Sequence, residues 1–389
     1  MSAFLFNGSI PTSKSLLNRA LIVKSHFSEF NIYGDSFCND VIVMKQAVED
    51  FENGKTTINC GEAGTVLRFM ALRVAREQGE FLLTGSGKLL SRLPDDLIQL
   101  LSQLGSQVEL IKEGFKVKSV GWKIMGDALH LQAKLSSQFA TAVFLNAWNY
   151  PLDLFITVPK SMFSMSYFKM TLNFLSSLGM SIYSNKTEYH IPKNQALVNS
   201  SYVGEADMSS TFAIAAAAII NGEAKLNSFS ENSIQPDTAF INILNQMNID
   251  YEIENSSVHF FKQDEYKNID ISLKDSPDLF PVLSVLSSFA SGTSRLYGAE
   301  HLIHKESNRI EATFDLLSKA GVEVTKTDDG LVIEGNPNIQ PNSFSFDARK
   351  DHRIAMAAAL LMLKGYNIEL TGRDTVNKSF PEFWDIIGL

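Results

Sequence analysis

The chain has 389 residues, more than one hydrophobic core usually organises, so two domains are expected. Hydrophobic residues make up 45% and charged residues 20% of the sequence, a globular composition that argues against disorder. The net charge of -9 argues against a general nucleic-acid or membrane-surface binder, although cations gathered in one place can still bind anions.

Six segments repeat one plan along the chain: a polar start, a helix of small apolar residues, a turn with glycine and a strand. The six helix starts lie, in chain order, at residues 13–15, 64–65, 136–137, 209–210, 277–278 and 351–352. The plan is clearest late in the chain, where the expected helices and their following strands are 211–220 and 224–229, 279–290 and 293–297, and 354–363 and 367–371. The sequence therefore predicts an α/β fold that is built from repeats.

Other helices of the repeats end at Gly105, Gly179 and Gly321, where glycine suits a left-handed cap. The apolar run at 212–220 is about half as long as a membrane-spanning helix requires. The two cysteines, Cys38 and Cys60, lack metal-ligand spacing. We therefore expect no metal site and a reducing, cytoplasmic location.

The polar residues at the helix starts have two readings. Ser, Thr and Asp are ordinary helix caps, and capping alone explains each of them. A helix start also offers unpaired N–H groups and the positive end of the helix dipole, which together hold phosphate or carboxylate. Neither a Walker loop nor a Gly-x-Gly-x-x-Gly fingerprint is present, so nucleotide cofactors are not indicated.

An ordered set of motifs resembles the 5-enolpyruvylshikimate-3-phosphate synthase family. Its first members are Pro-Thr-Ser-Lys-Ser at 11–15, Gly-Glu-Ala-Gly-Thr at 61–65 with Arg68, and Ser-Ser-Gln at 136–138. Glu-Ala-Asp-Met-Ser-Ser follows at 205–210, and then come Pro277-Asp278, Lys-Glu-Ser-Asn-Arg at 305–309, Asp-His-Arg at 351–353 and Asn377-Lys378. Each motif is weak alone, but the ordered set covers essentially the whole chain.

The resemblance implies two similar domains, each of three βαβαββ units, in the inside-out barrel of enolpyruvyl transferases with a ligand cleft between the domains. One domain is expected to combine residues 1–12 with 207–389, and the other to hold residues 13–206. The implied reaction transfers the enolpyruvyl group of phosphoenolpyruvate to the 5-hydroxyl of shikimate 3-phosphate and releases phosphate, in the route to chorismate and aromatic amino acids. The resemblance also implies a transferase without cofactor, expected to be a monomer, and a glyphosate target.

The resemblance carries roles onto matching residues. Those implied for shikimate 3-phosphate are Lys14, Ser15, Arg19, Ser136, Ser137, Ser164, Asp278, His301 and Lys305. Those implied for phosphoenolpyruvate are Lys14, Gly64, Arg92, Gln138, Arg309, Arg353 and Lys378. Two phosphorylated substrates need several cations, since one unit-charge pair at about 4 Å is worth only roughly 4 kcal/mol at an effective dielectric of 20. The motif positions supply such a set.

Catalysis requires a proton to leave the substrate hydroxyl and another to reach the enol methylene carbon. Asp278 is the candidate base for the hydroxyl, and Glu306 is the candidate at carbon, with help from Lys378 or Lys14. Cations and helix starts can stabilise the charge that develops, so no metal is required.

Five positions depart from the family pattern: Thr12, Glu62, Phe69, His301 and Asn308. They bear on substrate affinity and inhibitor response more than on the type of reaction. In its blander reading, His301 is a partly exposed loop residue.

Two other functions stay open. The related enolpyruvyl transferase acting on UDP-N-acetylglucosamine commonly carries Lys-Asn near its start and a reactive cysteine in a loop. Here Ser15 follows Lys14, and residues 85–94 contain no cysteine. A non-catalytic anion-binding homologue is the second alternative, against which the joint presence of Asp278 and Glu306 argues.

Overall fold

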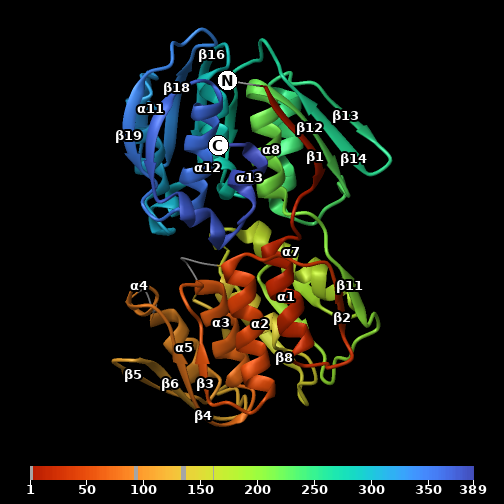
Figure 1. The fold of residues 1–389 in the computed structure, drawn as a ribbon. Helices are drawn as coiled ribbons and strands as arrows, with labels where there is room; N and C mark the ends of the chain where they lie inside the picture. The colour runs from red at the N-terminus through yellow and green to blue at the C-terminus, as the bar shows by residue number, and fades with distance from the viewer. Residues whose placement is uncertain (1–2, 92–94, 133–136, 161) are drawn as a thin grey trace. The chain divides into compact units, whose positions relative to one another are not determined.

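The computed structural model describes residues 3–91, 95–132, 137–160 and 162–389. The chain divides into two compact units (Figure 1): unit 1 contains residues 1–13 and 205–389, and unit 2 contains residues 14–204. The sequence analysis placed these divisions after residues 12 and 206.

Four sheets share one plan, in which a parallel pair of strands continues into two antiparallel strands. In unit 2, the strands of the first sheet are, in sheet order, β3 (Thr57–Asn59), β4 (Gln78–Thr84), β6 (Gly114–Val120) and β5 (Gln107–Ile111). Those of the second sheet are β7 (Leu129–His130), β8 (Leu154–Thr157), β10 (Glu188–Ile191) and β9 (Tyr183–Asn185). In unit 1, the strands of the first sheet are β1 (Phe4–Ser9), β12 (Gly222–Asn227), β14 (Ser257–Phe261) and β13 (Tyr251–Glu254). Those of the second sheet are β15 (Asp270–Ser272), β16 (Gly292–Tyr297), β18 (Gly330–Gly335) and β17 (Val324–Thr327).

Two further sheets have only a parallel pair among the described residues. In unit 2, β2 (Asn31–Tyr33) pairs with β11 (Ser201–Val203), and in unit 1, β19 (Ser343–Asp347) pairs with β20 (Asn367–Thr371). The α/β fold built from βαβαββ repeats is therefore confirmed. Among the described residues, four repeats have a four-stranded sheet and two have only the parallel pair.

Each unit contains three helices that contact one another pairwise. In unit 2 they are α1 (Lys14–Lys24), α3 (Gly64–Val74) and α6 (Gln138–Leu145), and in unit 1 they are α8 (Met208–Asn221), α10 (Phe280–Ser288) and α12 (His352–Leu363). Figure 1 shows α8 beside α12 in unit 1, and α1 to α3 side by side in unit 2. All but the last residue of α8 is buried, and its alanines and other small side chains let neighbouring helices approach closely.

The other helices lie between the strands or after them. They are α2 (Asn39–Glu52), α4 (Gly87–Leu90), α5 (Asp95–Gln103), α7 (Met165–Ser177), α9 (Phe240–Gln246), α11 (Arg309–Lys319) and α13 (Phe383–Ile387), with the 3-10 helices η1 (Pro236–Ala239), η2 (Pro277–Leu279), η3 (Glu300–His304) and η4 (Arg373–Lys378).

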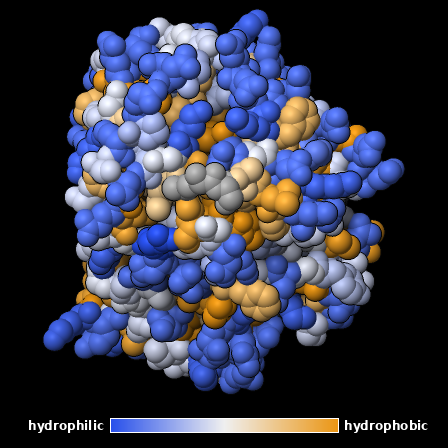
Figure 2. Space-filling view, turned by 45° about the horizontal axis from the view of Figure 1, so that its top comes forward, coloured by the Kyte–Doolittle hydropathy of each residue, from blue (hydrophilic) through white to orange (hydrophobic). Residues whose placement is uncertain are grey.

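Local sequence explains where several helices begin and end. The carboxylate of Asp207 accepts the backbone N–H of Ser210 at the start of α8, and that of Asp351 accepts the N–H of Arg353 at the start of α12. Gly105 and Gly321 have φ values of 82° and 79°, which confirms the predicted left-handed caps. Hydrophilic residues cover most of the face in Figure 2, and hydrophobic ones show there singly or in small groups.

Candidate active site

In unit 1, Arg309 is the centre of a charged cluster at the start of α11. Its side chain is 1% exposed, and its Nε lies 2.9 Å from Oδ2 of Asp351. Its Nη1 lies 2.8 Å from Oδ1 of Asp278, and its Nη2 lies 2.8 Å from Oε2 of Glu306. One buried guanidinium therefore ties together carboxylates from three chain segments, in the forked geometry that suits arginine.

Asp278, the candidate base, faces two further cations. Nη2 of Arg353 lies 2.8 Å from Oδ2 of Asp278, and Nζ of Lys305 lies 3.8 Å from its Oδ1. Asp278 lies in η2, just before α10, and Arg353 lies in the first turn of α12. The starts of two central helices thus come together, as the repeats require if they are to share a ligand.

The charged neighbours act on the pKa values of this cluster. Burial by itself lowers the pKa of Arg309, but the carboxylates of Asp351, Glu306 and Asp278 outweigh it and raise that pKa above the usual value. His301, in η3, is 5% exposed, and burial followed by the nearby Lys305 lowers its pKa to about 4. The reading of His301 as a partly exposed loop residue was wrong, because η3 folds it into the interior, where it is neutral near pH 7.

In unit 2, Lys14 lies at the start of α1, and its Nζ is 3.1 Å from Oδ2 of Asp40 in α2. Arg19, one turn further along α1, is 4% exposed. Its Nε donates to the hydroxyl of Thr171 at 2.8 Å, and its Nη2 donates to the carbonyl of Tyr167 at 3.3 Å. Burial lowers the pKa of Arg19 to about 10, which still leaves the side chain charged at neutral pH.

The first turns of α3 and α6 meet beside Gly64. Arg68 donates through Nη1 to Oε1 of Gln138, and Gln138 donates through Nε2 to the hydroxyl of Thr65 at 3.1 Å. A Cβ at Gly64 would stand 2.7 Å from Nη1 of Arg68, so the guanidinium occupies the space that a side chain would need. Arg68 therefore braces the turn that presents the backbone of Gly64.

The remaining predicted residues lie at other points of the two units. Ser15 is half-buried in α1, Ser137 is buried before α6, Ser164 is half-buried before α7 with φ of 55°, and Lys378 is half-buried at the end of η4. Arg92 and Ser136 lie outside the described residues.

Sequence reasoning missed two carboxylates that orient predicted substrate residues. Asp351 is fully buried and contacts Arg309 while also capping α12, and Asp40 contacts Lys14. Asp351 was visible as a helix start, which is the signal that could have marked it. For Asp40, the only signal in the sequence was its place in the first turn of α2.

Solved structures show the class of fold. The chain matches an EPSP synthase from Acinetobacter baumannii with a TM-score of 0.80 at 22% identity, covering 99% of this chain and 95% of that one. It matches the enolpyruvyl transferase NikO from Streptomyces tendae with a TM-score of 0.75 at 11% identity, covering 100% of this chain and 95% of that one. The fold is that of the enolpyruvyl transferases.

Sequence comparison narrows the class to one family. Residues 29–387 match the sequence model of the EPSP synthase (3-phosphoshikimate 1-carboxyvinyltransferase) family. A 3-phosphoshikimate 1-carboxyvinyltransferase of Methanococcus aeolicus is 31% identical over 85% of this chain and 78% of its own length. One of Syntrophobacter fumaroxidans is 29% identical over 97% of this chain and 95% of its own length. The chain belongs to the EPSP synthase family and is a transferase. Among the described residues, no helix is long and apolar enough to cross a membrane.

Proposed function

We propose that this chain transfers the enolpyruvyl group of phosphoenolpyruvate to the 5-hydroxyl of shikimate 3-phosphate, with release of phosphate. The observation that carries the proposal is the setting of Asp278, which has Lys305, Arg309 and Arg353 within 4 Å of its carboxylate. A carboxylate that three cations hold in place is positioned to accept a proton from a hydroxyl.

This placement supports the proton-transfer roles that we propose. Asp278 takes the proton of the 5-hydroxyl. Glu306, whose Oε2 lies 2.8 Å from Arg309, acts at the methylene carbon, with Lys14 or Lys378 as its partner. Because Arg309 contacts both carboxylates, it holds Asp278 and Glu306 at a fixed separation.

Binding of the two substrates is assigned by charge and by helix starts. For phosphoenolpyruvate we propose Lys14, Gly64, Arg92, Gln138, Arg309, Arg353 and Lys378, and for shikimate 3-phosphate Lys14, Ser15, Arg19, Ser136, Ser137, Ser164, Asp278, His301 and Lys305. His301 has a lowered pKa, so it would contribute a hydrogen bond from a neutral ring rather than a positive charge.

The test is phosphate release from phosphoenolpyruvate with shikimate 3-phosphate as acceptor. UDP-N-acetylglucosamine in a parallel reaction tests the related transferase. Asp278→Asn and Glu306→Gln keep the size of each side chain and are expected to lower kcat at least about 100-fold. Asp270→Asn, on the exposed strand β15 of the same unit, is the matched control and should leave kcat unchanged.

Two results would contradict the proposal. If the folded wild-type chain binds both substrates but releases no phosphate, the chain is an anion-binding homologue. If phosphate release requires UDP-N-acetylglucosamine, shikimate 3-phosphate is not the acceptor and the chain acts as the related transferase.

Glyphosate inhibition is proposed from the same site, because the inhibitor competes with phosphoenolpyruvate in this family. Gly64 has no side chain of its own to cover the backbone of this turn, and Glu62 is exposed just before it. An inhibition curve that stays flat into the millimolar range would contradict this proposal. A cytoplasmic location and a monomeric state stay predictions.

A further inference from the structure

The loop between η3 and α11 in unit 1 carries two of the residues proposed for the reaction. It consists of residues 305–308 and begins with Lys305 and Glu306. Ser307 follows Glu306 directly and is half-buried, and the proposed reaction gives it no part. Its hydroxyl nonetheless makes a specific contact, because it donates to Oδ2 of Asp351 at 3.0 Å.

Asp351 is held more firmly than the loop that contacts it. Its side chain is fully buried, and the Oδ2 atom that accepts the Ser307 hydroxyl also lies 2.9 Å from Nε of Arg309. Its Oδ1 accepts the backbone N–H of Arg353 at 3.0 Å, which ties the carboxylate to the first turn of α12. The side chain of Glu306, by contrast, is 27% exposed. Ser307 therefore links a partly exposed loop to a buried carboxylate that two helix starts hold in place.

Glu306 and Ser307 are joined through the charged cluster as well as through the chain. Ser307 contacts Asp351, and Asp351 contacts Arg309. Nη2 of Arg309 in turn lies 2.8 Å from Oε2 of Glu306, the neighbour of Ser307 in the chain. These contacts and the peptide bond between Glu306 and Ser307 close a ring. If one link of the ring is cut, the carboxylate of Glu306 gains freedom to move away from Arg309 and spends less time in the position that the reaction needs.

We propose that Ser307 is a positioning residue, whose hydrogen bond to Asp351 holds the carboxylate of Glu306 beside Arg309. The inference rests on the proposed function, in which Glu306 acts at the methylene carbon. In this role Ser307 acts through Glu306 and needs no contact with either substrate. A misplacement of about 1 Å can lower a rate about 100-fold, so the loss of this one hydrogen bond is expected to lower kcat about tenfold.

The kinetic test removes the hydroxyl with Ser307→Ala and measures phosphate release from phosphoenolpyruvate and shikimate 3-phosphate. The kcat should fall about tenfold and the KM of each substrate should change less than about twofold, because Glu306 acts on a reacting atom rather than in binding. Ser307→Thr keeps a hydroxyl and should retain kcat within about threefold of the wild type. In the Glu306→Gln background, Ser307→Ala should lower kcat by less than about a further twofold, because the carboxylate that it positions is gone.

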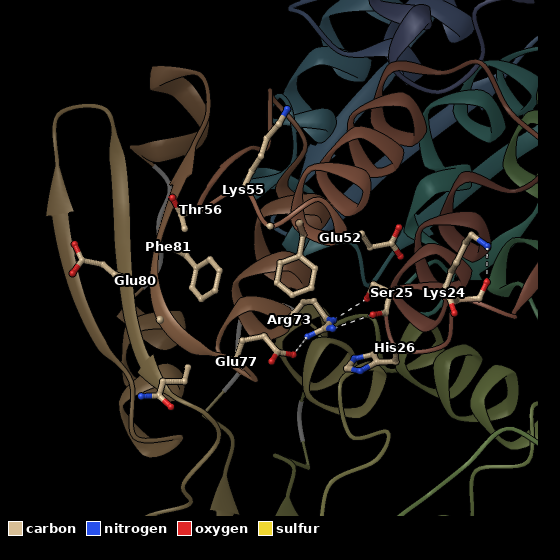
Figure 3. Close-up of a pocket in the computed structure, with 15 residues that line it drawn as sticks. Lys24, Ser25, His26, Glu52, Lys55, Thr56, Arg73, Glu77, Glu80 and Phe81 are labelled. Carbon is tan, nitrogen blue, oxygen red and sulfur yellow. Dashed lines mark hydrogen bonds and ion pairs between the residues drawn. The ribbon is translucent and has the colours of Figure 1, made fainter.

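Unit 2 provides a matched control in the wall of the groove that Figure 3 shows. Nη1 of Arg73 lies 2.7 Å from Oε1 of Glu77, and Nε of Arg73 donates to Oγ of Ser25 at 2.9 Å. Ser25→Ala therefore removes a serine hydroxyl beside an arginine–glutamate pair, as Ser307→Ala does, but none of these three residues has a proposed role in the reaction. Its kcat should stay within about twofold of the wild type. Urea unfolding verifies that both variants are folded.

A second measurement reports on the position of Glu306 without turnover. The full chain is deuterated and labelled with ¹⁵N-arginine, and the exchange of the Arg309 side-chain protons with water is followed by NMR. In Ser307→Ala, the protons on Nη2, which faces Glu306, should exchange at least about threefold faster than in the wild type. The proton on Nε, which faces Asp351, should exchange at an unchanged rate.

Four results would each overturn the inference. They are an unchanged kcat in Ser307→Ala, an equal loss in Ser25→Ala, the same tenfold loss in the Glu306→Gln background, and unchanged exchange at Nη2 of Arg309. If the folded wild-type chain releases no phosphate, the proposed function fails instead. The exchange at Nη2 then still decides whether Ser307 holds Glu306 in place.

Discussion

The two units surround the arginines of the candidate site with different partners. In unit 1, the guanidinium of Arg309 contacts three carboxylates, and the guanidinium of Arg353 contacts one of the same three. In unit 2, Arg19 donates to a hydroxyl and to backbone carbonyls, and Arg68 donates to an amide.

The difference separates two tasks that a cationic site must perform. Carboxylate partners fix the geometry of a buried cation but also cancel its positive charge. Neutral hydrogen-bond partners fix the geometry of the cation and leave its positive charge in place. We therefore propose that unit 1 supplies the oriented acid and base groups, and that unit 2 keeps more of its positive charge for the substrate anions. Lys14 is intermediate, because it contacts Asp40.

The largest expected effect comes from removing the central cation of unit 1. Arg309→Met leaves the fully buried carboxylate of Asp351 without its arginine partner and should lower the free energy of unfolding by about 3–5 kcal/mol. Arg19→Met in unit 2 removes hydrogen bonds to neutral groups and should cost about 1–3 kcal/mol. Urea unfolding at pH 7 measures both. Equal losses would show that the charged partners of Arg309 do not distinguish the two units.

The second expected effect is a pH dependence that comes from His301 in unit 1. Its folded pKa of about 4 lies below the unfolded value of 6.5, so the folded state binds fewer protons. This contribution to stability is complete above pH 6.5 and is lost as the pH falls toward 4, by roughly 3 kcal/mol in total. His301→Asn removes the titrating group.

The measurement is the difference in unfolding free energy between wild type and His301→Asn at several pH values. The difference should shift in favour of the variant by roughly 3 kcal/mol between pH 7 and pH 4. A difference that does not vary with pH would mean that the ring becomes protonated without penalty in the folded state.

A smaller effect is expected at the neutral contacts of unit 2. Gly64→Ala places a Cβ 2.7 Å from Nη1 of Arg68, which pushes the guanidinium away from Gln138. The KM for phosphoenolpyruvate should rise about tenfold, equal to roughly 1.4 kcal/mol, with little change in kcat.

A double-mutant cycle with Arg68→Lys provides the control. If Gly64→Ala acts through Arg68, it should add little to the effect of Arg68→Lys. Fully additive changes in KM would show that the new methyl group meets the substrate directly.

The smallest effect is expected for Asn308→Asp, at one of the five positions that depart from the family pattern. Asn308 already caps α11 by accepting the N–H of Glu311 at 3.2 Å, and Asp caps a helix about equally well. The free energy of unfolding should change by less than about 0.5 kcal/mol, as measured by urea unfolding. A larger change would show that Asn308 has a partner beyond its cap.

Much of the fold was predictable from the sequence because it depends on neighbouring residues. The helix at 354–363 and the strand at 367–371 follow from local periodicity, and the structure places α12 at His352–Leu363 and β20 at Asn367–Thr371. The left-handed caps at Gly105 and Gly321 were also predicted, because glycine alone adopts that conformation without steric cost.

The sequence by itself also determined the family, since the order of the motifs does not depend on how the chain folds. Only the tertiary structure decided the partners of the charged groups. Arg309 and Asp351 are 42 residues apart, and Lys14 and Asp40 are 26 residues apart, so no local pattern pairs them. The burial of His301 was equally hidden, because it depends on how η3 packs against the rest of unit 1. Charge type and helix position are local properties, whereas the pairing and burial that set a pKa arise only when distant segments pack together.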